Sequence, residues 1–272
     1  MTKIGFIGMG NMGYALLKGL LAAGGDMEIM FTCKTEEKKK RICKETGVEA
    51  ALTGGHLATW ADILILAVKP RTFDEVFEEI AGCAKAGMII ISLAPGWSSE
   101  RIFAALKSKG AKELRVVRAM PNTPALIGCG MTGIAYDEER FTPQERRAIE
   151  DIFAGAGKCV RVTEEQMDAV VCASGSSPAY VYMFIEELAA SVEKLGLDKD
   201  KALLMVSETV IGAAKMVQES GESPQVLRER VCSKGGTTIE GVKKLQERGF
   251  GNAIREATAA CFERSREIGK QN

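Results

Sequence analysis

Three glycines near the N-terminus, Gly8, Gly10 and Gly13, have the spacing GxGxxG. A predicted strand, Lys3–Ile7, precedes them, and a predicted helix, Gly10–Ala23, follows. In this context the first glycine permits a tight turn, the second lets the backbone approach a pyrophosphate, and the third allows close helix–strand packing. The helix N-terminus adds free N–H groups. We therefore predict that a dinucleotide pyrophosphate binds the segment made of Gly8, Met9, Gly10, Asn11, Met12 and Gly13. The alternative is a glycine-rich turn without a ligand.

The end of the second predicted strand, Glu28–Thr32, indicates which dinucleotide is bound. A domain that prefers NAD usually carries Asp or Glu there, to bind the ribose 2′-hydroxyl. This chain instead has Lys34 and Thr35, a cation and a hydroxyl that suit a 2′-phosphate. The sequence therefore favours NADP as cofactor, with NADPH preferred and NADH still usable. The alternative is that Lys34 is an ordinary exposed lysine at a helix start.

Composition excludes several other classes of site. The 272 residues include a single histidine, His56, and eight cysteines without CxxC spacing, so we expect no metal site. We expect His56 to be a surface or loop residue without a catalytic role. Lys and Arg total 36 and so do Asp and Glu, while aromatic residues make up 6%, which disfavours a nucleic-acid partner.

We also expect no association with a membrane. No apolar stretch reaches the roughly 20 residues that a membrane span needs. The first residues lead into a strand without the apolar core of a secretion signal. Scattered cysteines are typical of a reducing compartment, and we expect a cytoplasmic protein.

Short β-branched segments alternate with amphipathic ones up to residue 162. Asp62–Val68 and Met88–Leu93 are nearly all apolar, as in strands buried on both faces of a parallel sheet. Further strands are predicted at Arg115–Met120, Gly133–Tyr136 and Cys159–Val162, with helices at Thr35–Thr46 and Pro143–Ala154. This alternation predicts an α/β fold, with a doubly wound parallel sheet of the Rossmann type over residues 1–162.

The pattern becomes purely helical over residues 163–272. The predicted helices are Glu164–Ala173, Pro178–Leu195, Lys199–Ser220, Pro224–Cys232, Thr238–Arg248 and Ala253–Gly269. Apolar residues such as Met183, Phe184 and Leu204 repeat along these helices. So small a bundle cannot easily cover that much apolar surface alone, so we predict at least a homodimer formed through this domain.

Three further segments carry groups suited to ligand binding. Ala67, Val68, Lys69 and Pro70 follow one buried strand, and Met120, Pro121, Asn122 and Thr123 follow another. Strand ends of this kind meet at the ligand-binding edge of an open sheet. The third segment, Ser233-Lys234-Gly235-Gly236-Thr237-Thr238, lies between two predicted helices. With the glycine motif, this ordered set resembles the pyrroline-5-carboxylate reductase family over nearly the whole chain.

The resemblance implies hydride transfer from NADPH or NADH to the ring imine of 1-pyrroline-5-carboxylate, giving L-proline. It implies a Rossmann domain and a helical domain that dimerises and binds the substrate. Ala67, Val68, Lys69 and Pro70 would line the nicotinamide ribose, and Met120, Asn122 and Thr123 would border the nicotinamide. Ser233 and the amides of Gly235, Gly236 and Thr237 would bind the substrate carboxylate. Thr238 would be the catalytic residue, with its hydroxyl at the ring nitrogen.

The physical reading of the segment Ser233–Thr238 agrees with these roles. Two glycines expose backbone N–H groups, hydroxyls add donors, and a helix begins directly afterwards, which together make a nest for a small anion. The alternative is a helix–helix turn in which Thr237 or Thr238 is the N-cap. Lys234, Ser177 and Pro95 depart from the commoner residues of the family, and an asparagine that some relatives have near Gly54 is missing.

Two other functions compete with this one. A β-hydroxyacid dehydrogenase would need a lysine on the first helix after the sheet, and no lysine occurs between Val162 and Val192. A dinucleotide-binding sensor without turnover would not need the carboxylate nest.

Overall fold

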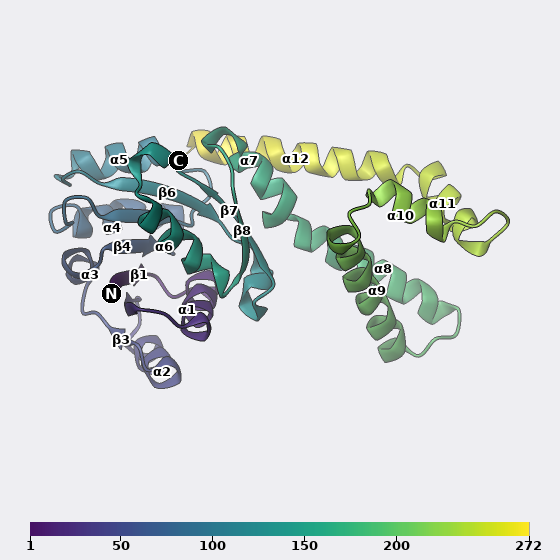
Figure 1. Cartoon of the computed structure of the whole chain (residues 1–272), viewed down its shortest axis with the longest axis horizontal. Coiled ribbons are helices and arrows are strands. Elements are labelled where there is room, and N and C mark those ends of the chain that lie inside the picture. Colours follow the sequence, from purple (N-terminus) through teal and green to yellow (C-terminus); the bar gives the residue numbers. More distant parts are fainter. Residues whose placement is uncertain (272) are drawn as a thin grey trace. The chain divides into compact units, whose positions relative to one another are not determined.

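One eight-stranded sheet forms the centre of the N-terminal part of the chain (Figure 1). The structure is a computed structural model that describes residues 1–271, with only the backbone described at Gln271. Its strands are β1 (Thr2–Ile7), β2 (Met27–Thr32), β3 (Glu49–Ala50), β4 (Ile63–Leu66), β5 (Ile89–Ser92), β6 (Arg115–Met120), β7 (Gly130–Ala135) and β8 (Gly157–Arg161). Their spatial order is β3-β2-β1-β4-β5-β6-β7-β8. The order reverses between β1 and β4, which is where ligands of open α/β sheets bind.

The sheet is mixed rather than wholly parallel. The strands from β1 to β6 run parallel to one another, but β7 runs antiparallel to β6, and β8 runs parallel to β7. The prediction of a parallel sheet is therefore wrong at this edge. The connection over residues 121–129 contains only a 3₁₀ turn, Thr123–Ile127. A parallel crossover takes about a dozen residues or more, so the chain returns as a hairpin.

Helices cover both faces of the sheet, as predicted for a doubly wound fold. One core cluster contains residues of α1 (Asn11–Ala23), α2 (Glu36–Thr46) and α6 (Pro143–Ala154). The other contains residues of α3 (Gly54–Trp60), α4 (Phe73–Ile80) and α5 (Ser99–Ser108). Every residue of β4 and β5 is buried between them, which confirms the prediction for these two strands.

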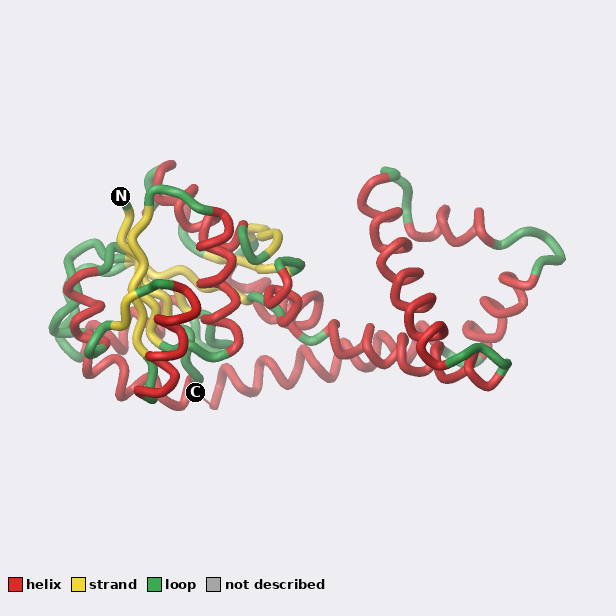
Figure 2. The backbone as a smooth tube through the Cα atoms, turned by 90° about the horizontal axis from the view of Figure 1, so that it is seen from below, coloured by secondary structure: helices red, strands yellow, loops and turns green. Residues whose placement is uncertain are grey.

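The chain after β8 is helical throughout its described part, as predicted (Figure 2). Its long helices are α8 (Ser177–Lys194), α9 (Lys199–Glu219), α10 (Pro224–Val231), α11 (Thr237–Glu247) and α12 (Phe250–Gln271). The single helix predicted at Glu164–Ala173 is instead a 3₁₀ turn, the short α7 (Met167–Val170) and a π turn, Val171–Gly175. No helix in the described part of the chain is both long and apolar enough to cross a membrane.

The chain forms two compact units, and their division differs from the predicted boundary at residue 162. Met1–Ser176 and the part of α12 from Cys261 onward make the first unit, and Ser177–Ala260 makes the second. The predicted boundary marks the end of the sheet. The chain remains in the first unit up to Ser176, and the end of α12 belongs to that unit too, since Ser265 Oγ donates to Asp168 Oδ1 at 2.6 Å.

The second unit buries little of its own apolar surface. No residue of α8 is buried, and α9 buries only Ala202 and Val206. Large apolar side chains are exposed along both helices: Tyr182, Met183, Phe184, Leu188, Leu203, Leu204, Met205 and Ile211. These eight residues are called the apolar face of α8 and α9 below.

Candidate active site

The glycine loop joins β1 to α1 in the conformation that the motif predicts. Gly8 has a φ of +96°, and a Cβ atom there would lie 2.6 Å from Val68 Cγ1. A Cβ atom at Gly13 would lie 2.5 Å from the carbonyl oxygen of Gly8. Both positions therefore require glycine for steric reasons, one for the turn and one for the close approach of α1 to the strand.

Gly10 differs, because no heavy atom lies within 4 Å of the place where its Cβ would be. It is the N-cap of α1, and no side chain caps this helix end. The first N–H groups of a helix have no partner within the helix. A pyrophosphate fits this combination of free donors, positive helix end and absent side chain.

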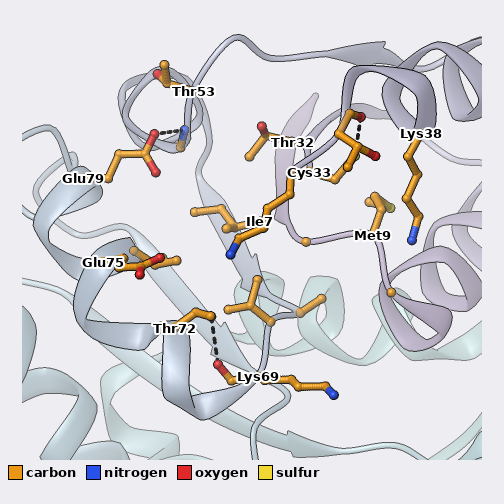
Figure 3. A pocket seen from close by; sticks show the side chains of 18 of the residues that line it. Ile7, Met9, Thr32, Cys33, Lys38, Thr53, Lys69, Thr72, Glu75 and Glu79 are labelled. Carbon is orange, nitrogen blue, oxygen red and sulfur yellow. Dashed lines mark hydrogen bonds between the residues drawn. The ribbon is translucent and has the colours of Figure 1, made fainter.

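A cavity of about 650 Å³ extends from this loop (Figure 3). That volume is in the range of pockets for small molecules and cofactors. It brings together eight residues predicted for the site: Gly8, Met9, Gly10, Lys34, Thr35, Ala67, Val68 and Lys69. Four others from the same segments do not line it. Asn11, Met12 and Gly13 form the first turn of α1, and Pro70 begins a 3₁₀ turn.

Basic side chains line the cavity at the end of β2 and the start of α2. Lys34 and Lys38 form no ion pair with any described residue, whereas Lys39 pairs with Glu36 at 2.8 Å. No carboxylate occurs between Thr32 and Thr35. The sequence analysis missed Lys38, although it lies only four residues after Lys34 and belongs to the same basic stretch of the chain.

Two carboxylates of α4, Glu75 and Glu79, line the cavity from another side and were also missed. The backbone N–H of Gly54, at the start of α3, donates to Glu79 Oε1 at 2.6 Å. Their spacing of four residues places both on one face of α4. Figure 3 shows Glu75 and Glu79 on one side of the view and Lys38 on the other.

The predicted nicotinamide residues lie at the end of β6, outside this cavity. Asn122 is buried, and its side-chain amide is already engaged. Its Nδ2 donates to the carbonyl oxygen of Ser174 at 3.0 Å, and its Oδ1 accepts from the Met131 N–H at 2.9 Å. The side chain thus ties the loop after β6 to the π turn and to β7. Met120 is half-buried and Thr123 is exposed.

The segment Ser233–Thr238 lies in the second unit, directly before α11. Thr237 and Thr238 are the first two residues of this helix, and the N-cap is Gly236, without a side-chain cap. The alternative in which either threonine is the N-cap is therefore wrong. Neither hydroxyl has a hydrogen-bond partner among the residues described, and the segment is largely exposed. A helix N-terminus with free hydroxyls and amides suits a small carboxylate.

His56 does not line the cavity, and of the cysteines in the described part of the chain only Cys33 lines it. His56 is exposed on α3, and its N–H donates to Thr53 Oγ1 at 3.0 Å. Over the described residues, no group of three or more His, Cys, Asp or Glu side chains is placed to hold a metal ion.

Known proteins resemble the chain over nearly its whole length. Residues 164–268 match the family described as "Pyrroline-5-carboxylate reductase dimerisation", and residues 3–96 match "NADP oxidoreductase coenzyme F420-dependent". Pyrroline-5-carboxylate reductase of Escherichia coli is 38% identical over 270 residues, covering 98% of each chain.

Solved structures agree. A pyrroline-5-carboxylate reductase from Coxiella burnetii has a TM-score of 0.89 and 34% identity, with 98% of each chain covered. Plasmodium falciparum pyrroline carboxylate reductase with NADP bound has a TM-score of 0.83 and 29% identity, again with 98% of each chain covered.

Proposed function

The chain belongs to the pyrroline-5-carboxylate reductase family, and from this premise we propose how its residues share the reaction between the two units. The enzyme is an NAD(P)-dependent oxidoreductase that reduces 1-pyrroline-5-carboxylate to L-proline, the last step of proline biosynthesis. One hydride and one proton are added across the ring C=N bond, and NAD(P)⁺ is released. One observation supports this assignment of cofactor to the first unit and substrate to the second. Each unit has a helix N-terminus that no side chain caps, at Gly10 in the first unit and at Gly236 in the second.

The first unit binds the dinucleotide. When bound, NADPH supplies the hydride. The loop Gly8–Gly13 holds the pyrophosphate, and Lys34 and Thr35, with Lys38, receive the 2′-phosphate, so that NADPH is preferred over NADH. The segment Ala67–Pro70 lines the nicotinamide ribose. Met120 and Thr123 border the nicotinamide, and Asn122 acts by holding their loop in place.

The second unit binds the substrate. Ser233 and the amides of Gly235, Gly236 and Thr237 hold the carboxylate, and the Thr238 hydroxyl accepts a hydrogen bond from the protonated ring nitrogen. A protonated imine is already electrophilic, and hydride addition discharges it instead of creating an alkoxide. The site must therefore align the reactants and exclude water, and it needs neither a metal nor a Cys–His pair.

The helical region 164–268 carries the dimerisation domain of the family. We propose that two copies associate through the apolar face of α8 and α9, giving at least a homodimer. A cytoplasmic location is likewise a proposal, supported by the scattered cysteines of a biosynthetic enzyme.

The test of function is the oxidation of NADPH and NADH by the purified protein with 1-pyrroline-5-carboxylate, with proline measured as product. We expect proline to form in a 1:1 ratio with oxidised cofactor, and faster with NADPH. Dinucleotide binding without any proline would favour the sensor alternative and would contradict the proposed roles of Ser233 and Thr238.

A further inference from the structure

We propose that Glu79 recognises the adenine ring of the dinucleotide, by accepting a hydrogen bond from the exocyclic amine. Glu79 would then select adenine over a purine that carries a carbonyl oxygen in place of that amine. The inference rests on the proposed function, because it requires a dinucleotide in the cavity beside Gly10.

The geometry of the fold directs the adenosine half of the dinucleotide toward α4. A pyrophosphate at the first strand–helix turn places the adenosine ribose beside the end of the second strand. In this chain the cavity continues from that strand end to α4, where Val76 lines it. Ile7 adds apolar surface beside Gly54, since its Cδ1 would lie 3.3 Å from a Cβ atom at position 54, and the exposed Leu52 lines the same cavity. Apolar side chains in the lining of a cavity suit an aromatic ring.

Glu79 is fixed at this end of the cavity. The Gly54 N–H donates to its Oε1 at 2.6 Å (Figure 3), and a Cβ atom at position 54 would lie 2.8 Å from Oε2. The absence of a side chain at Gly54 therefore lets the carboxylate approach the backbone. Because Oε1 is occupied by this bond, Oε2 remains to accept another. Glu75 lines the same cavity, but no hydrogen bond or ion pair with a described residue fixes its carboxylate.

The charges of the cavity agree with this orientation. The adenosine half of NADP has an anionic 2′-phosphate and, on the ring, an amine that donates hydrogen bonds. Lys34 and Lys38 supply cations for the phosphate, and Glu79 forms no ion pair among the residues described here. A carboxylate would repel the phosphate and attract the amine, so the α4 side of the cavity fits the ring.

The experiment compares the dissociation constants of NADPH and of its hypoxanthine analogue, in which a carbonyl oxygen replaces the amine. We expect the wild type to bind NADPH about tenfold more tightly, since a hydrogen bond to a charged group is lost with the analogue. In Glu79→Gln the amide oxygen keeps the bond from Gly54, so the amide NH₂ turns to the cavity and donates to the carbonyl oxygen. The tenfold preference should then disappear or reverse.

Glu78→Gln is the matched control. Glu78 is the neighbour of Glu79 on α4, lies outside the cavity lining and pairs with Lys109 at 2.9 Å. Glu78→Gln removes the same charge as Glu79→Gln and should keep the wild-type ratio of the dissociation constants of NADPH and its hypoxanthine analogue.

Equal affinity of the wild type for both dinucleotides would overturn the inference, and this measurement needs no folded variant. An unchanged ratio in a folded Glu79→Gln protein would overturn it as well. The proposed function fails separately, if NADPH binds with its adenine preference but no proline forms from 1-pyrroline-5-carboxylate.

Discussion

At the scale of the residue, the state of the Thr238 hydroxyl matters most for catalysis. It lies in the first turn of α11 with no partner among the residues described, and it caps nothing. Thr238→Ala should therefore leave the melting temperature nearly unchanged. It removes one hydrogen bond to the ring nitrogen, worth roughly 1.5 kcal/mol or more when charge-assisted, so kcat/KM should fall about tenfold.

Three measurements on the same variants decide this prediction: melting temperature, NADPH affinity and steady-state kinetics. Thr238→Ser keeps a hydroxyl and should retain most of the activity. Full activity in a folded Thr238→Ala enzyme would remove the substrate role.

The second prediction at the scale of the residue is that Lys34 contributes to the preference for NADPH over NADH. Replacing Lys34 by Asp places a carboxylate beside the expected 2′-phosphate, so the ratio of kcat/KM for NADPH over NADH should fall. Loss of one exposed ion pair is worth up to about 1 kcal/mol, or fivefold, and repulsion adds to it. Because Lys38 lines the same cavity, the double variant Lys34→Ala, Lys38→Ala should lower the ratio further than either single change. A wild type that already prefers NADH would contradict the role of Lys34.

At the scale of the element, the β1–α1 turn distinguishes a glycine needed for binding from one needed for folding. Gly10→Val places its side chain in open space, so the fold should survive while dinucleotide affinity falls by more than tenfold. Gly13→Val is the matched contrast, because its Cβ would lie 2.5 Å from the Gly8 carbonyl oxygen and α1 would have to move. Thermal unfolding and NADPH titration of both variants test the distinction. Unchanged affinity in folded Gly10→Val would contradict a pyrophosphate at this turn.

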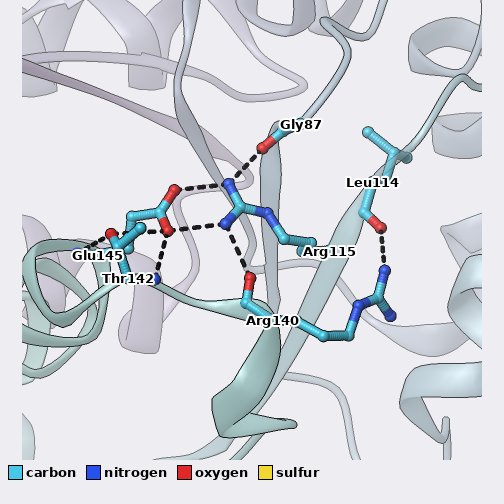
Figure 4. Close-up of polar contacts among 6 residues, drawn as sticks. All are labelled: Gly87, Leu114, Arg115, Arg140, Thr142 and Glu145. Carbon is cyan, nitrogen blue, oxygen red and sulfur yellow. Dashed lines mark hydrogen bonds and ion pairs between the residues drawn. The ribbon is translucent and has the colours of Figure 1, made fainter.

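A second pair of elements, β6 and α6, is held together by Arg115 (Figure 4). Its guanidinium donates to both oxygens of Glu145, at 2.6 and 2.8 Å, and to the carbonyl oxygens of Gly87 and Arg140. The hydrogen bonds that Glu145 accepts from Arg115, with those from Thr142, lower the pKa of Glu145 to about 2. The capping box with Thr142 adds further bonds to the same carboxylate.

This pKa predicts how the stability of the sheet unit depends on pH. A carboxyl whose pKa is depressed on folding stabilises the protein above its unfolded pKa, and the contribution is lost as the pH falls toward the folded value. The stability difference between wild type and Glu145→Gln should therefore be largest above about pH 4.5 and should shrink toward pH 2. Urea unfolding at a series of pH values measures it. A difference that stays constant from pH 7 to pH 3 would contradict the prediction.

Comparison of individual elements shows which parts of the fold and the site a local sequence pattern can predict. Continuous apolar segments predicted β4 and β5 because their burial on both faces leaves no polar position. The reversal at β7 depends on how the chain returns from β6, and strand composition does not encode direction. Glu79 escaped prediction for a similar reason, since its contact with Gly54 depends on how α3 and α4 pack against each other, which no local sequence pattern gives.

At the scale of the whole molecule, the second unit is incomplete as a single chain. Its two longest contiguous helices, α8 and α9, together bury only Ala202 and Val206, while Met183 and Leu204 are 63% and 62% exposed. An exposed apolar surface of this extent marks a protein interface, and the family to which the chain belongs dimerises through this region.

We therefore expect at least a dimer at micromolar concentration in light scattering, with the apolar face of α8 and α9 at the interface. Leu204→Glu places a charge on that face and should shift the population toward monomer, because an unpaired charge in an interface costs several kcal/mol. Leu21→Glu is the control: Leu21 is also exposed, at 41%, but lies on α1 of the sheet unit, so it should leave the assembly unchanged. If the loop Ser233–Thr238 needs the assembled helical unit to be held in place, the Leu204→Glu monomer should still bind NADPH but lose proline formation. A stable wild-type monomer would contradict the assembly, and a fully active Leu204→Glu monomer would show that each chain binds its substrate alone.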